Sequence, residues 1–480
     1  MADKNLLGIT VKKSENTSEW YTQVIQKAEL IEYTDVSGCI VFRPGSYEIW
    51  EKLQQYLDSR FSELGVRNAY FPLFIPESYL QKETDHVEGF TPEVAWVTHT
   101  GTSKLAERLA VRPTSETIMY PSYAKWIKSH RDLPLLLNQW CNVVRWEFKH
   151  PVPFLRTREF LWQEGHTAHA TKEGADKEVR RILDIYADTF EKLVAVPVLK
   201  GIKSEKEKFA GADYTTSLEC FLPNGKAIQG CTSHALGQNF AKVFDIKYLD
   251  ENSEWKYVWQ NSWGFTTRTI GIMILVHSDD KGLVIPPKLV SKKVVLVPII
   301  FDKTKDAVLS KSKELVASLS EFGAFLDDRE EYSPGWKFNE WELKGVPLRL
   351  EFGPKDLEKG HVVMVRRDTG EKIFVKWDEL KDTVHEQLAA MQDDLFTKAK
   401  DRLESSIVEV SDIDEAISMI KDGKLVKAPW CTGPDCEEQI KDKTGGAKSL
   451  NMPFDQEPLN CKCFNCDKAA KMMAYFQKSY

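Results

Sequence analysis

Two short charged segments, residues 145–148 and 156–160, hold the side chains best suited to binding a nucleotide. We expect them on two adjacent strands, joined by a loop whose prolines cost no ladder hydrogen bonds. Because strand side chains alternate, Arg145 and Glu147 are predicted to share one face. Such a hairpin places a guanidinium over a phosphate, a carboxylate near an adenine amine or ribose, and the ring of Phe160 under a base. Taken alone, the pattern also fits a hairpin covered with surface salt bridges.

Three further segments carry polar residues at the ends of expected elements. Thr114 is placed to cap the helix that begins near Glu116. Thr232 and His234 lie in a stretch rich in small residues, where a structural role is the simpler interpretation for the histidine. Arg268 opens a helix directly after a strand, and the positive end of a helix favours an anion such as a triphosphate. Each of these residues, considered singly, has an ordinary structural explanation.

Composition limits the class of protein. The 480 residues suffice for two to four domains, and 42% hydrophobic and 29% charged residues are typical of globular proteins. We expect no membrane partner, because no apolar run reaches about 18 residues, and the first residues lack a signal-peptide core. The nine cysteines are therefore expected in the reducing cytoplasm, as thiols or metal ligands. A net charge of −7 argues against a uniformly basic surface but allows a local basic patch.

Hydrophobic periodicity predicts the order of the elements. In the first part of the chain we expect a helix at 46–64, a strand at 68–74, a helix at 116–129, a strand at 135–147, a helix at 176–193, and a strand leading into a buried helix within 260–277. After a proline-containing boundary at 285–288, strands at 293–301, 324–326, 348–352 and 361–366 alternate with helices at 306–322 and 336–343. This alternation predicts a small α/β domain with a largely parallel sheet, followed by a charged helix at 382–404.

Five of the nine cysteines lie near the end of the sequence. Four thiolates suit tetrahedral zinc, and we expect the ligands to be Cys431, Cys436, Cys463 and Cys466, with Cys461 as the substitute. The two-residue spacing of Cys463 and Cys466 is the common knuckle spacing. A reduced cluster without metal is the alternative. The other four cysteines lack ligand spacing and are expected to be core thiols.

The order of these segments resembles the class II aminoacyl-tRNA synthetases. Pro72 after a long helix resembles motif 1, residues 145–160 resemble motif 2, and residues 264–268 resemble motif 3. Neither a phosphate-binding Gly-x-x-x-x-Gly-Lys-Ser/Thr loop nor a class I signature occurs in the sequence. More narrowly, the chain resembles archaeal and eukaryote-like prolyl-tRNA synthetases, in Arg112-Pro-Thr-Ser-Glu116 and in residues 142–150, 154–166, 206–211 and 261–268.

The resemblance implies roles for individual residues. For ATP it implies Arg145 on the α-phosphate and the amino-acid carboxylate, Glu147 at the adenine, Arg156 and Arg268 on the outer phosphates, Phe160 stacked on adenine, and Gln229 and Thr232 along the nucleotide and ribose. Arg145 and Arg268 would be the catalytic pair. For proline it implies a pocket of Thr114, Glu116, Arg145, Trp162, His166, Phe209 and His234. Phe90 and Glu93 would help close the site, and Glu219 would be a magnesium ligand.

The resemblance also implies a fold and an activity. It implies an α+β catalytic domain with an antiparallel sheet at 1–285, an α/β anticodon-binding domain at 286–400, and a small α+β zinc-binding domain at 401–480. In the second domain Glu340, Arg349 and Lys355 would contact anticodon bases. The implied reaction uses ATP and Mg²⁺ to convert L-proline to prolyl-adenylate and transfers proline to tRNA(Pro), in a cytoplasmic homodimer with structural Zn²⁺.

Two further expectations concern specificity. The segment between motifs 2 and 3 has no room for an inserted editing domain, so we expect measurable activation of cysteine without clearance of Cys-tRNA. Threonyl enzymes of this class carry a zinc-binding cysteine where this chain has Thr114, which favours proline over threonine. The alternatives are a class II synthetase for threonine or serine, and a synthetase-like regulatory or RNA-binding protein without catalysis.

Overall fold

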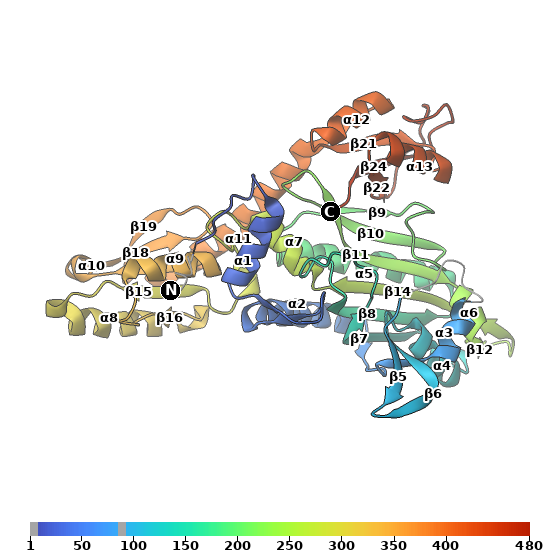
Figure 1. Cartoon of the computed structure of the whole chain (residues 1–480), viewed down its shortest axis with the longest axis horizontal. Coiled ribbons are helices and arrows are strands. Elements are labelled where there is room, and N and C mark those ends of the chain that lie inside the picture. Colours follow the sequence, from blue (N-terminus) through green and yellow to red (C-terminus); the bar gives the residue numbers. More distant parts are fainter. Residues whose placement is uncertain (1–7, 85–92) are drawn as a thin grey trace.

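The computed structural model describes residues 8–84 and 93–480. Its centre is an eight-stranded sheet in the order β23-β9-β10-β11-β14-β8-β7-β3 (Figure 1). The sheet is antiparallel except where the edge strand β3 runs parallel to β7, so the predicted antiparallel catalytic sheet is confirmed. Its strands are β3 (Arg67–Asn68), β7 (Leu135–Val144), β8 (Glu159–His169), β9 (Leu199–Ile202), β10 (Tyr214–Phe221), β11 (Ala227–Gly237), β14 (Trp259–Thr266) and β23 (Met452–Pro453).

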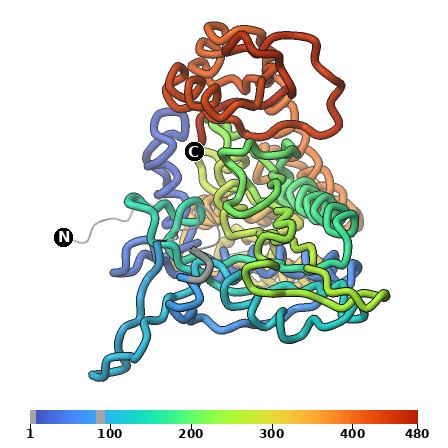
Figure 2. The backbone as a smooth tube through the Cα atoms, turned by 90° about the vertical axis from the view of Figure 1, so that its right-hand side faces the viewer, coloured from blue at the N-terminus to red at the C-terminus, as the bar shows by residue number. Residues whose placement is uncertain are grey.

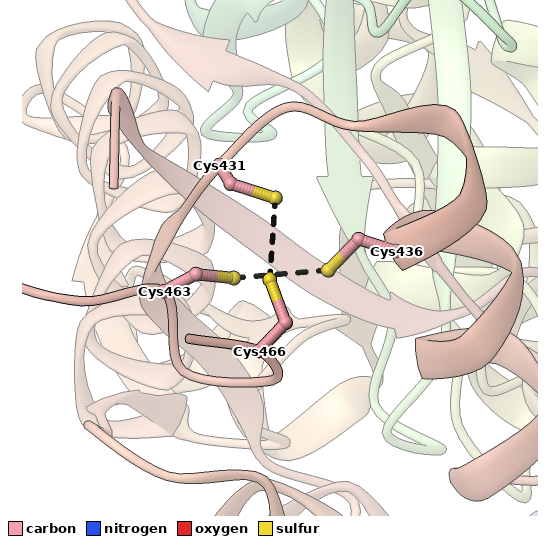
Figure 3. A group of neighbouring side chains, drawn as sticks. All are labelled: Cys431, Cys436, Cys463 and Cys466. Carbon is pink, nitrogen blue, oxygen red and sulfur yellow. Dashed lines mark hydrogen bonds between the residues drawn. The ribbon is translucent and has the colours of Figure 1, made fainter. Parts of the chain in front are cut away.

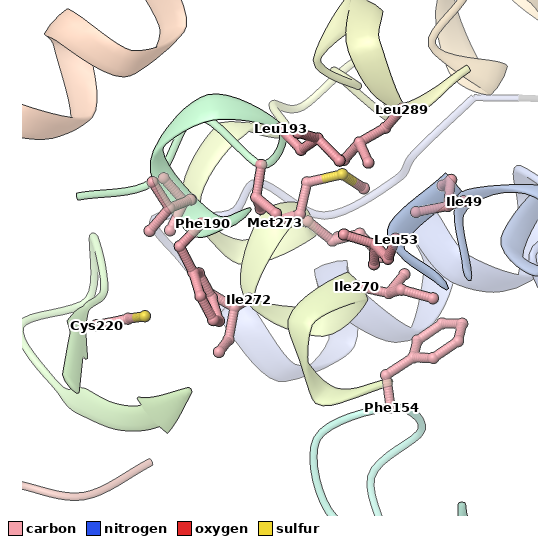
Figure 4. Close-up of a cluster of buried hydrophobic side chains, with 14 of the residues drawn as sticks. Ile49, Leu53, Phe154, Phe190, Leu193, Cys220, Ile270, Ile272, Met273 and Leu289 are labelled. Carbon is pink, nitrogen blue, oxygen red and sulfur yellow. The ribbon is translucent and has the colours of Figure 1, made fainter. Parts of the chain in front are cut away.

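Three helices cover one face of this sheet. They are α2 (Pro44–Glu63), α5 (Lys172–Lys192) and α7 (Arg268–His277), and they pack against one another and against β10, β11 and β14. Helix α7 is apolar on every side, as expected of a helix enclosed by protein, and its isoleucines meet α2 and the end of α5 (Figure 4). On β8, Gln163 points towards this layer, because it accepts a hydrogen bond from Tyr186 of α5 at 2.6 Å. Its neighbours Trp162 and Glu164 therefore face the opposite side of the sheet.

Smaller elements surround the central sheet. A β4–β6–β5 ribbon projects from the body, which Figure 2 shows as the light-blue hairpin. The smaller elements around the sheet are α1 (Thr17–Lys27), β1 (Ile31–Tyr33), β2 (Ile40–Phe42), β4 (Phe74–Pro76), α3 (Glu77–Thr84), β5 (Trp96–Thr100), β6 (Ser103–Val111), α4 (Glu116–Trp126), α6 (Asn239–Phe244), β12 (Lys247–Leu249) and β13 (Trp255–Tyr257).

The segment after the first boundary forms the predicted α/β unit. Its sheet has the order β16-β15-β17-β18-β19, with β15 parallel to both β16 and β17 and the remaining pairs antiparallel. The parallel half follows from the strand–helix alternation in the sequence. Its elements are β15 (Val294–Pro298), α8 (Lys305–Ser318), β16 (Phe325–Leu326), α9 (Pro334–Lys344), β17 (Leu348–Phe352), α10 (Pro354–Lys359), β18 (His361–Arg366) and β19 (Lys372–Lys376).

The long helix α11 (Leu380–Ser406) leads to a small α+β unit, as predicted, and this unit lies over the β9 end of the central sheet (Figures 1 and 2). Strand β23 belongs to this last segment of the chain yet pairs with β9, so the unit continues the catalytic sheet. The other elements are β20 (Ile407–Glu409), α12 (Ile413–Lys421), β21 (Leu425–Trp430), α13 (Pro434–Lys443), β22 (Ala447–Ser449) and β24 (Met472–Lys478).

Two sequence-based boundaries are wrong. The strand expected at 68–74 is two short strands, because β3 pairs with β7 whereas β4 pairs with β6. The strand expected to reach residue 147 ends at Val144, so Arg145 and Glu147 do not share a strand face. The N–H of Arg145 still donates to the carbonyl of Arg158, but that of Trp146 donates to the carbonyl of Glu93 in another part of the chain. In the described ranges, no helix is both long enough and apolar enough to cross a membrane.

A glycine in β8 tests the packing beneath the site. Gly165 lies opposite Trp263 of β14, and a Cβ added at Gly165 would meet the indole ring at 2.2 Å. We predict that Gly165→Ala lowers the free energy of unfolding by about 1–3 kcal/mol, because the fully buried indole has no room to move. Chemical denaturation measures this. Gly335→Ala is the control, since no atom lies within 4 Å of its added Cβ. Equal unfolding midpoints for Gly165→Ala and wild type would contradict the prediction.

Candidate active site

A cavity of about 270 Å³ opens on the sheet face opposite α5. The elements around it are β8, β11, β14, the start of α7, and the loops at residues 145–157 and 203–213. The predicted site residues that line it are Thr114, Glu116, Arg145, Arg156, Phe160, Trp162, His166, Phe209, Gln229, Thr232, His234 and Arg268. The structure thus brings together residues spread over more than a hundred positions of the sequence.

Other predicted residues lie elsewhere. Glu147 is exposed in the turn beyond β7 and does not line the cavity. Glu219 is buried, and its carboxylate pairs with the ammonium of Lys203 at 2.7 Å. The side chain of Glu93 is exposed, and Phe90 lies outside the described residues.

Two arginines dominate one end of the cavity. Arg145 Nε donates to the carbonyl of Pro113 at 2.9 Å, and its guanidinium lies over the rings of Phe160 and Trp162 at 5.5 and 5.3 Å. Arg268 Nε donates to the carbonyl of Leu155 at 3.2 Å, and its Nη1 donates to that of Gln229 at 3.2 Å. These contacts fix the planes of the two guanidinium groups and leave their other N–H donors directed at the cavity.

The arginines concentrate positive charge. Within residues 8–84 and 93–480, no carboxylate forms a salt bridge with Arg145 or Arg268. Burial lowers the pKa of Arg268 to about 10, and the nearby charges of Arg145 and Arg156 act in the same direction. Burial also lowers the pKa of Arg145, although Glu147, Glu116 and Glu164 oppose it. Because the cations destabilise one another, this end of the cavity favours a polyanion.

The other end of the cavity is polar and buried. The hydroxyl of Thr114 donates to the carboxylate of Glu116, so Thr114 is not the helix cap that the sequence suggested. Ser115 holds the cap position instead, and its hydroxyl donates to the carboxylate of Glu164. Thr114 and Glu116 therefore present oxygen atoms to a ligand. Trp162 and Phe209 add aromatic surface to the same cavity.

The sequence analysis did not identify Glu164, although Trp162, Glu164 and His166 are two residues apart and therefore share one face of β8. Its carboxylate accepts from His166 Nε2 at 3.0 Å and from Gln139 Nε2 at 2.9 Å, besides Ser115. Burial would raise the pKa of Glu164, but these hydrogen bonds and the charge of His166 outweigh burial and lower it. For His166, burial opposes protonation, whereas Glu116 and Glu164 raise the pKa above the ordinary value. The hydrogen bond with Glu164 therefore favours the protonated form of His166.

His234 has the opposite character. Its Nδ1 is hydrogen-bonded with Thr215 Oγ1 and its Nε2 with Thr232 Oγ1, both at 2.9 Å. Burial, together with the charges of His166 and Arg145, lowers the pKa of His234 to about 3, so the ring is neutral. Phe209 covers this ring with 4.8 Å between centroids. The structural interpretation of His234 is correct, and the same ring also lines the cavity.

A larger cavity, of about 750 Å³, lies between the end of α7 and α11. Lys13, Lys398 and Arg402 line it, together with aspartates. Three of these aspartates are paired: Asp279 with Arg367, and both Asp368 and Asp394 with Arg366. It contains neither the predicted nucleotide residues nor the acid–histidine group of the smaller cavity. The candidate active site is therefore the smaller cavity.

Four of the five clustered cysteines converge in the last unit (Figure 3). The sulfurs of Cys431, Cys436, Cys463 and Cys466 lie within 4.8 Å of one another, and the Cys436–Cys463 and Cys431–Cys466 pairs are 3.7 Å apart. Tetrahedral zinc with bonds of about 2.3 Å requires sulfurs about 3.8 Å apart, which fits this cluster. Cys461 is exposed and is not one of the four.

The predicted anticodon residues lie on the α/β unit. Glu340 is buried and accepts from Arg329 and, at 2.9 Å, from Lys344. Arg349 pairs with Glu351 at 2.9 Å, and Lys355 is exposed. The sequence analysis missed a neighbouring aromatic pair, Tyr332 and Trp336, whose rings stack at 3.8 Å with Arg329 over both.

Comparison with known proteins agrees with this architecture. Residues 96–277 match the family model "tRNA synthetase class II core domain (G, H, P, S and T)", residues 293–387 match "Anticodon binding domain", and residues 413–480 match "Prolyl-tRNA synthetase, C-terminal".

Individual relatives match along almost the whole chain. The chain is 51% identical to the cytoplasmic proline–tRNA ligase of Arabidopsis thaliana, over 99% of this chain and 91% of that protein. It is 54% identical to the proline–tRNA ligase of Natranaerobius thermophilus, over 95% of this chain and 94% of that protein. The crystal structure of prolyl-tRNA synthetase from Cryptosporidium parvum, complexed with halofuginone and AMPPNP, superposes with a TM-score of 0.95 at 50% identity, covering 99% and 100% of the two chains. The chain therefore belongs to the prolyl-tRNA synthetases, within the class II aminoacyl-tRNA synthetases.

Proposed function

We propose that the chain activates L-proline with ATP to form prolyl-adenylate and transfers the prolyl group to tRNA(Pro). The observation that carries this proposal is one cavity with two unlike ends. One end holds Arg145 and Arg268, which form no salt bridge among the described residues, and the other holds a buried Thr114–Glu116–His166 group between aromatic walls. The relatives named as proline–tRNA ligases support the same conclusion.

At the arginine end, Arg145 would bind the α-phosphate and the proline carboxylate together. Arg156 and Arg268 would bind the outer phosphates, and Phe160 would stack on adenine with Gln229 and Thr232 beside the ribose. A guanidinium group suits a phosphate because its planar N–H donors can form two parallel hydrogen bonds with the phosphate oxygens. Magnesium would supply further charge neutralisation on the triphosphate. Glu147 and Glu219 stay in the proposal as the adenine contact and the magnesium ligand, and Glu219 would have to leave Lys203 first.

At the polar end, the secondary ammonium of proline would meet Glu116 and the Thr114 hydroxyl. Because His166 Nε2 is hydrogen-bonded to Glu164, the carboxylate of Glu116 would remain for the ligand. The pyrrolidine ring would lie between Trp162 and Phe209, with the neutral His234 below. A neutral imidazole adds no repulsion to a bound ammonium, whereas an imidazolium would.

The reaction then requires little covalent help from the protein. A proline carboxylate oxygen forms a bond to the α-phosphorus as the bond to the pyrophosphate oxygen breaks, and pyrophosphate leaves with the electron pair. Arg145 holds both reacting groups, which converts the encounter into a positioned reaction. The arginines stabilise the negative charge that develops in the transition state. A hydroxyl of the tRNA 3′ end subsequently attacks the prolyl carbonyl and displaces AMP.

The core lacks an editing insertion in our proposal. Between β8 and β14 the described chain runs through α5, β9, β10, β11, α6, β12 and β13, which are the sheet and its short connections. A pocket alone separates substrates of similar size by only about 1–3 kcal/mol. We therefore propose that cysteine is activated at a measurable rate.

We propose three domains with the bounds 1–285, 286–400 and 401–480. In the second, Glu340, Arg349 and Lys355 would contact anticodon bases, with the Tyr332–Trp336 stack as a platform for an unpaired base. In the third, the four-cysteine cluster would hold structural zinc. The cytoplasm is the proposed location, since none of the nine cysteines is in a disulfide and a relative is named as cytoplasmic.

We propose a homodimer formed through the motif 1 region. Large aromatic side chains are exposed there, including Tyr70 at 70% and Trp126 at 51%. Phe74, Tyr79 and Trp96 are also exposed on β4, α3 and β5, which lie side by side. Several large aromatic side chains exposed in one region of the chain are typical of a protein interface.

The nucleotide assignment predicts the effect of removing one arginine. Arg145→Ala should reduce proline-dependent ATP–pyrophosphate exchange by about 10²–10³-fold, because a donor to the transition state is lost. Circular dichroism should remain that of wild type. Arg181→Ala, at an exposed position of α5, is the matched control and should keep full exchange. Exchange by Arg145→Ala within about tenfold of wild type would refute the assignment.

The metal assignment predicts which cysteine matters. The purified protein should contain about one zinc per chain by mass spectrometry of the metal. Cys436→Ser should lose most of this zinc and melt at a lower temperature, because a ligand is removed from the tetrahedral group. Cys461→Ser should retain both zinc and stability, since Cys461 lies outside the group. Equal zinc loss in the two variants would contradict the four-cysteine assignment.

The interface assignment predicts a change in mass. Sedimentation equilibrium should give twice the mass of one chain for wild type. Tyr70→Glu combined with Trp126→Glu should give the monomer mass, because it places unpaired charges in a desolvated interface. Phe374→Glu is the control, since Phe374 is 69% exposed on β19 of the α/β unit. A dimer that survives the double substitution would place the interface elsewhere.

A further inference from the structure

The last unit of the chain contacts the loop that closes the proline end of the cavity. This loop, residues 203–213, joins β9 to β10 and contributes Glu207 and Phe209 to the cavity lining. Several of its contacts come from far along the sequence. Ser204 Oγ donates to Glu437 Oε1 at 3.1 Å, and Lys448 Nζ donates to Glu207 Oε1 at 3.1 Å.

The Ser204–Glu437 contact is the buried one. Ser204 and Glu437 are 3% and 4% exposed, and the same carboxylate oxygen also accepts from the hydroxyl of Ser449. The ion pair of Lys448 with Glu207 is partly exposed, as is that of Lys206 with Glu438. Exposed pairs change an equilibrium by at most about fivefold, whereas hydrogen bonds to a buried carboxylate change it by about tenfold or more. The buried contact is therefore the stronger constraint on the loop.

Ser204 organises the turn that delivers Phe209. The backbone N–H of Glu207 donates to Ser204 Oγ at 3.2 Å, and that of Lys208 donates to the Ser204 carbonyl at 2.9 Å. The N–H of Phe209 then donates to Thr215 Oγ1 at 2.9 Å, the same hydroxyl that is bonded to His234. A displacement of Ser204 would thus move the ring that covers His234.

Glu437 lies in the sequence directly after Cys436, within the first turn of α13. The position of α13 relative to the catalytic sheet is further held by β23, which pairs with β9 immediately before the loop. Cys436 of the cysteine cluster is therefore adjacent in sequence to Glu437, which a buried hydrogen bond links to Ser204 of loop 203–213.

We propose that Glu437 is a positioning residue for proline binding: through Ser204 it holds loop 203–213 so that Phe209 closes the pocket over His234. This rests on the proposed function, because it assigns the pocket to proline. The small last unit then has a part in substrate affinity, in addition to any effect on stability.

The experiment compares Glu437→Ala, Ser204→Ala and Glu437→Gln with wild type, and uses Asp435→Ala as the control. Asp435 is an exposed residue of the same helix turn. Each variant is assayed for the KM of proline and the KM of ATP in pyrophosphate exchange, for zinc content and for melting temperature. Trypsin cleavage at Lys206 and Lys208 reports directly on the order of the loop, with or without activity.

We expect Glu437→Ala and Ser204→Ala to raise the KM of proline about tenfold, with the KM of ATP and the zinc content unchanged. Both should accelerate cleavage in the loop. Glu437→Gln keeps an acceptor for both serines and should restore wild-type values, as should Asp435→Ala. Combining Glu437→Ala with Ser204→Ala should add little to either change, because both remove the same contact.

Two results would overturn the proposal. An unchanged KM of proline and unchanged cleavage in Ser204→Ala would show that the contact does not position the loop. An equal rise of both KM values, with a lower melting temperature, would show general destabilisation. If wild type shows no proline-dependent exchange, the proposed function fails, whereas the cleavage rates still decide whether Glu437 orders the loop.

Discussion

The structure depends on holding positive charge at a fixed place that water only partly reaches. Removing a cation from water costs several kcal/mol, and each hydrogen bond to a charged group returns about 1.5–3 kcal/mol. Arg268 has two carbonyl partners and Arg145 has one, so their contacts offset this cost only in part. The part of this cost that the hydrogen bonds do not offset lowers the pKa of Arg145 and of Arg268. A bound polyphosphate would relieve it, which explains why these arginines have no carboxylate partners among the described residues.

The antiparallel sheet makes that placement possible. On β8 the side chains alternate between the α5 layer and the cavity, so Trp162, Glu164 and His166 face the cavity in a row. The helix layer behind the sheet is tightly filled with aromatic and aliphatic side chains, and α7 extends from this layer to present Arg268 at its first residue. Rigid packing on one face thus fixes charge on the other. The last unit extends the same sheet through β23, which explains how it reaches the loop of Phe209.

The sequence was sufficient for features that depend on local pattern. Periodicity predicted α2 and α5, because one face of each helix is apolar, and short apolar runs predicted the strands of the α/β unit. The cysteine spacing predicted the four cysteines that converge. Features that depend on distant partners were not predictable. The end of β7 at Val144 depends on loops from elsewhere in the chain, and the helix cap at Ser115 depends on Glu164, which lies 49 residues later. No sequence motif around Glu164 marks it as a site residue. Its spacing of two residues from His166 on β8 nevertheless places both side chains on the cavity face.

The most direct test of the account is amino-acid-dependent ATP–pyrophosphate exchange, measured in parallel with proline, cysteine, threonine and alanine. The account predicts strong exchange with proline and a weaker but measurable signal with cysteine, lower by about 10–200-fold, because cysteine is close to proline in volume and the pocket alone must separate them. It predicts only background exchange with threonine, since Thr114 stands where the resemblance places a zinc-binding cysteine in threonyl enzymes. Exchange with threonine equal to that with proline, or none with any amino acid from folded protein containing zinc, would contradict it.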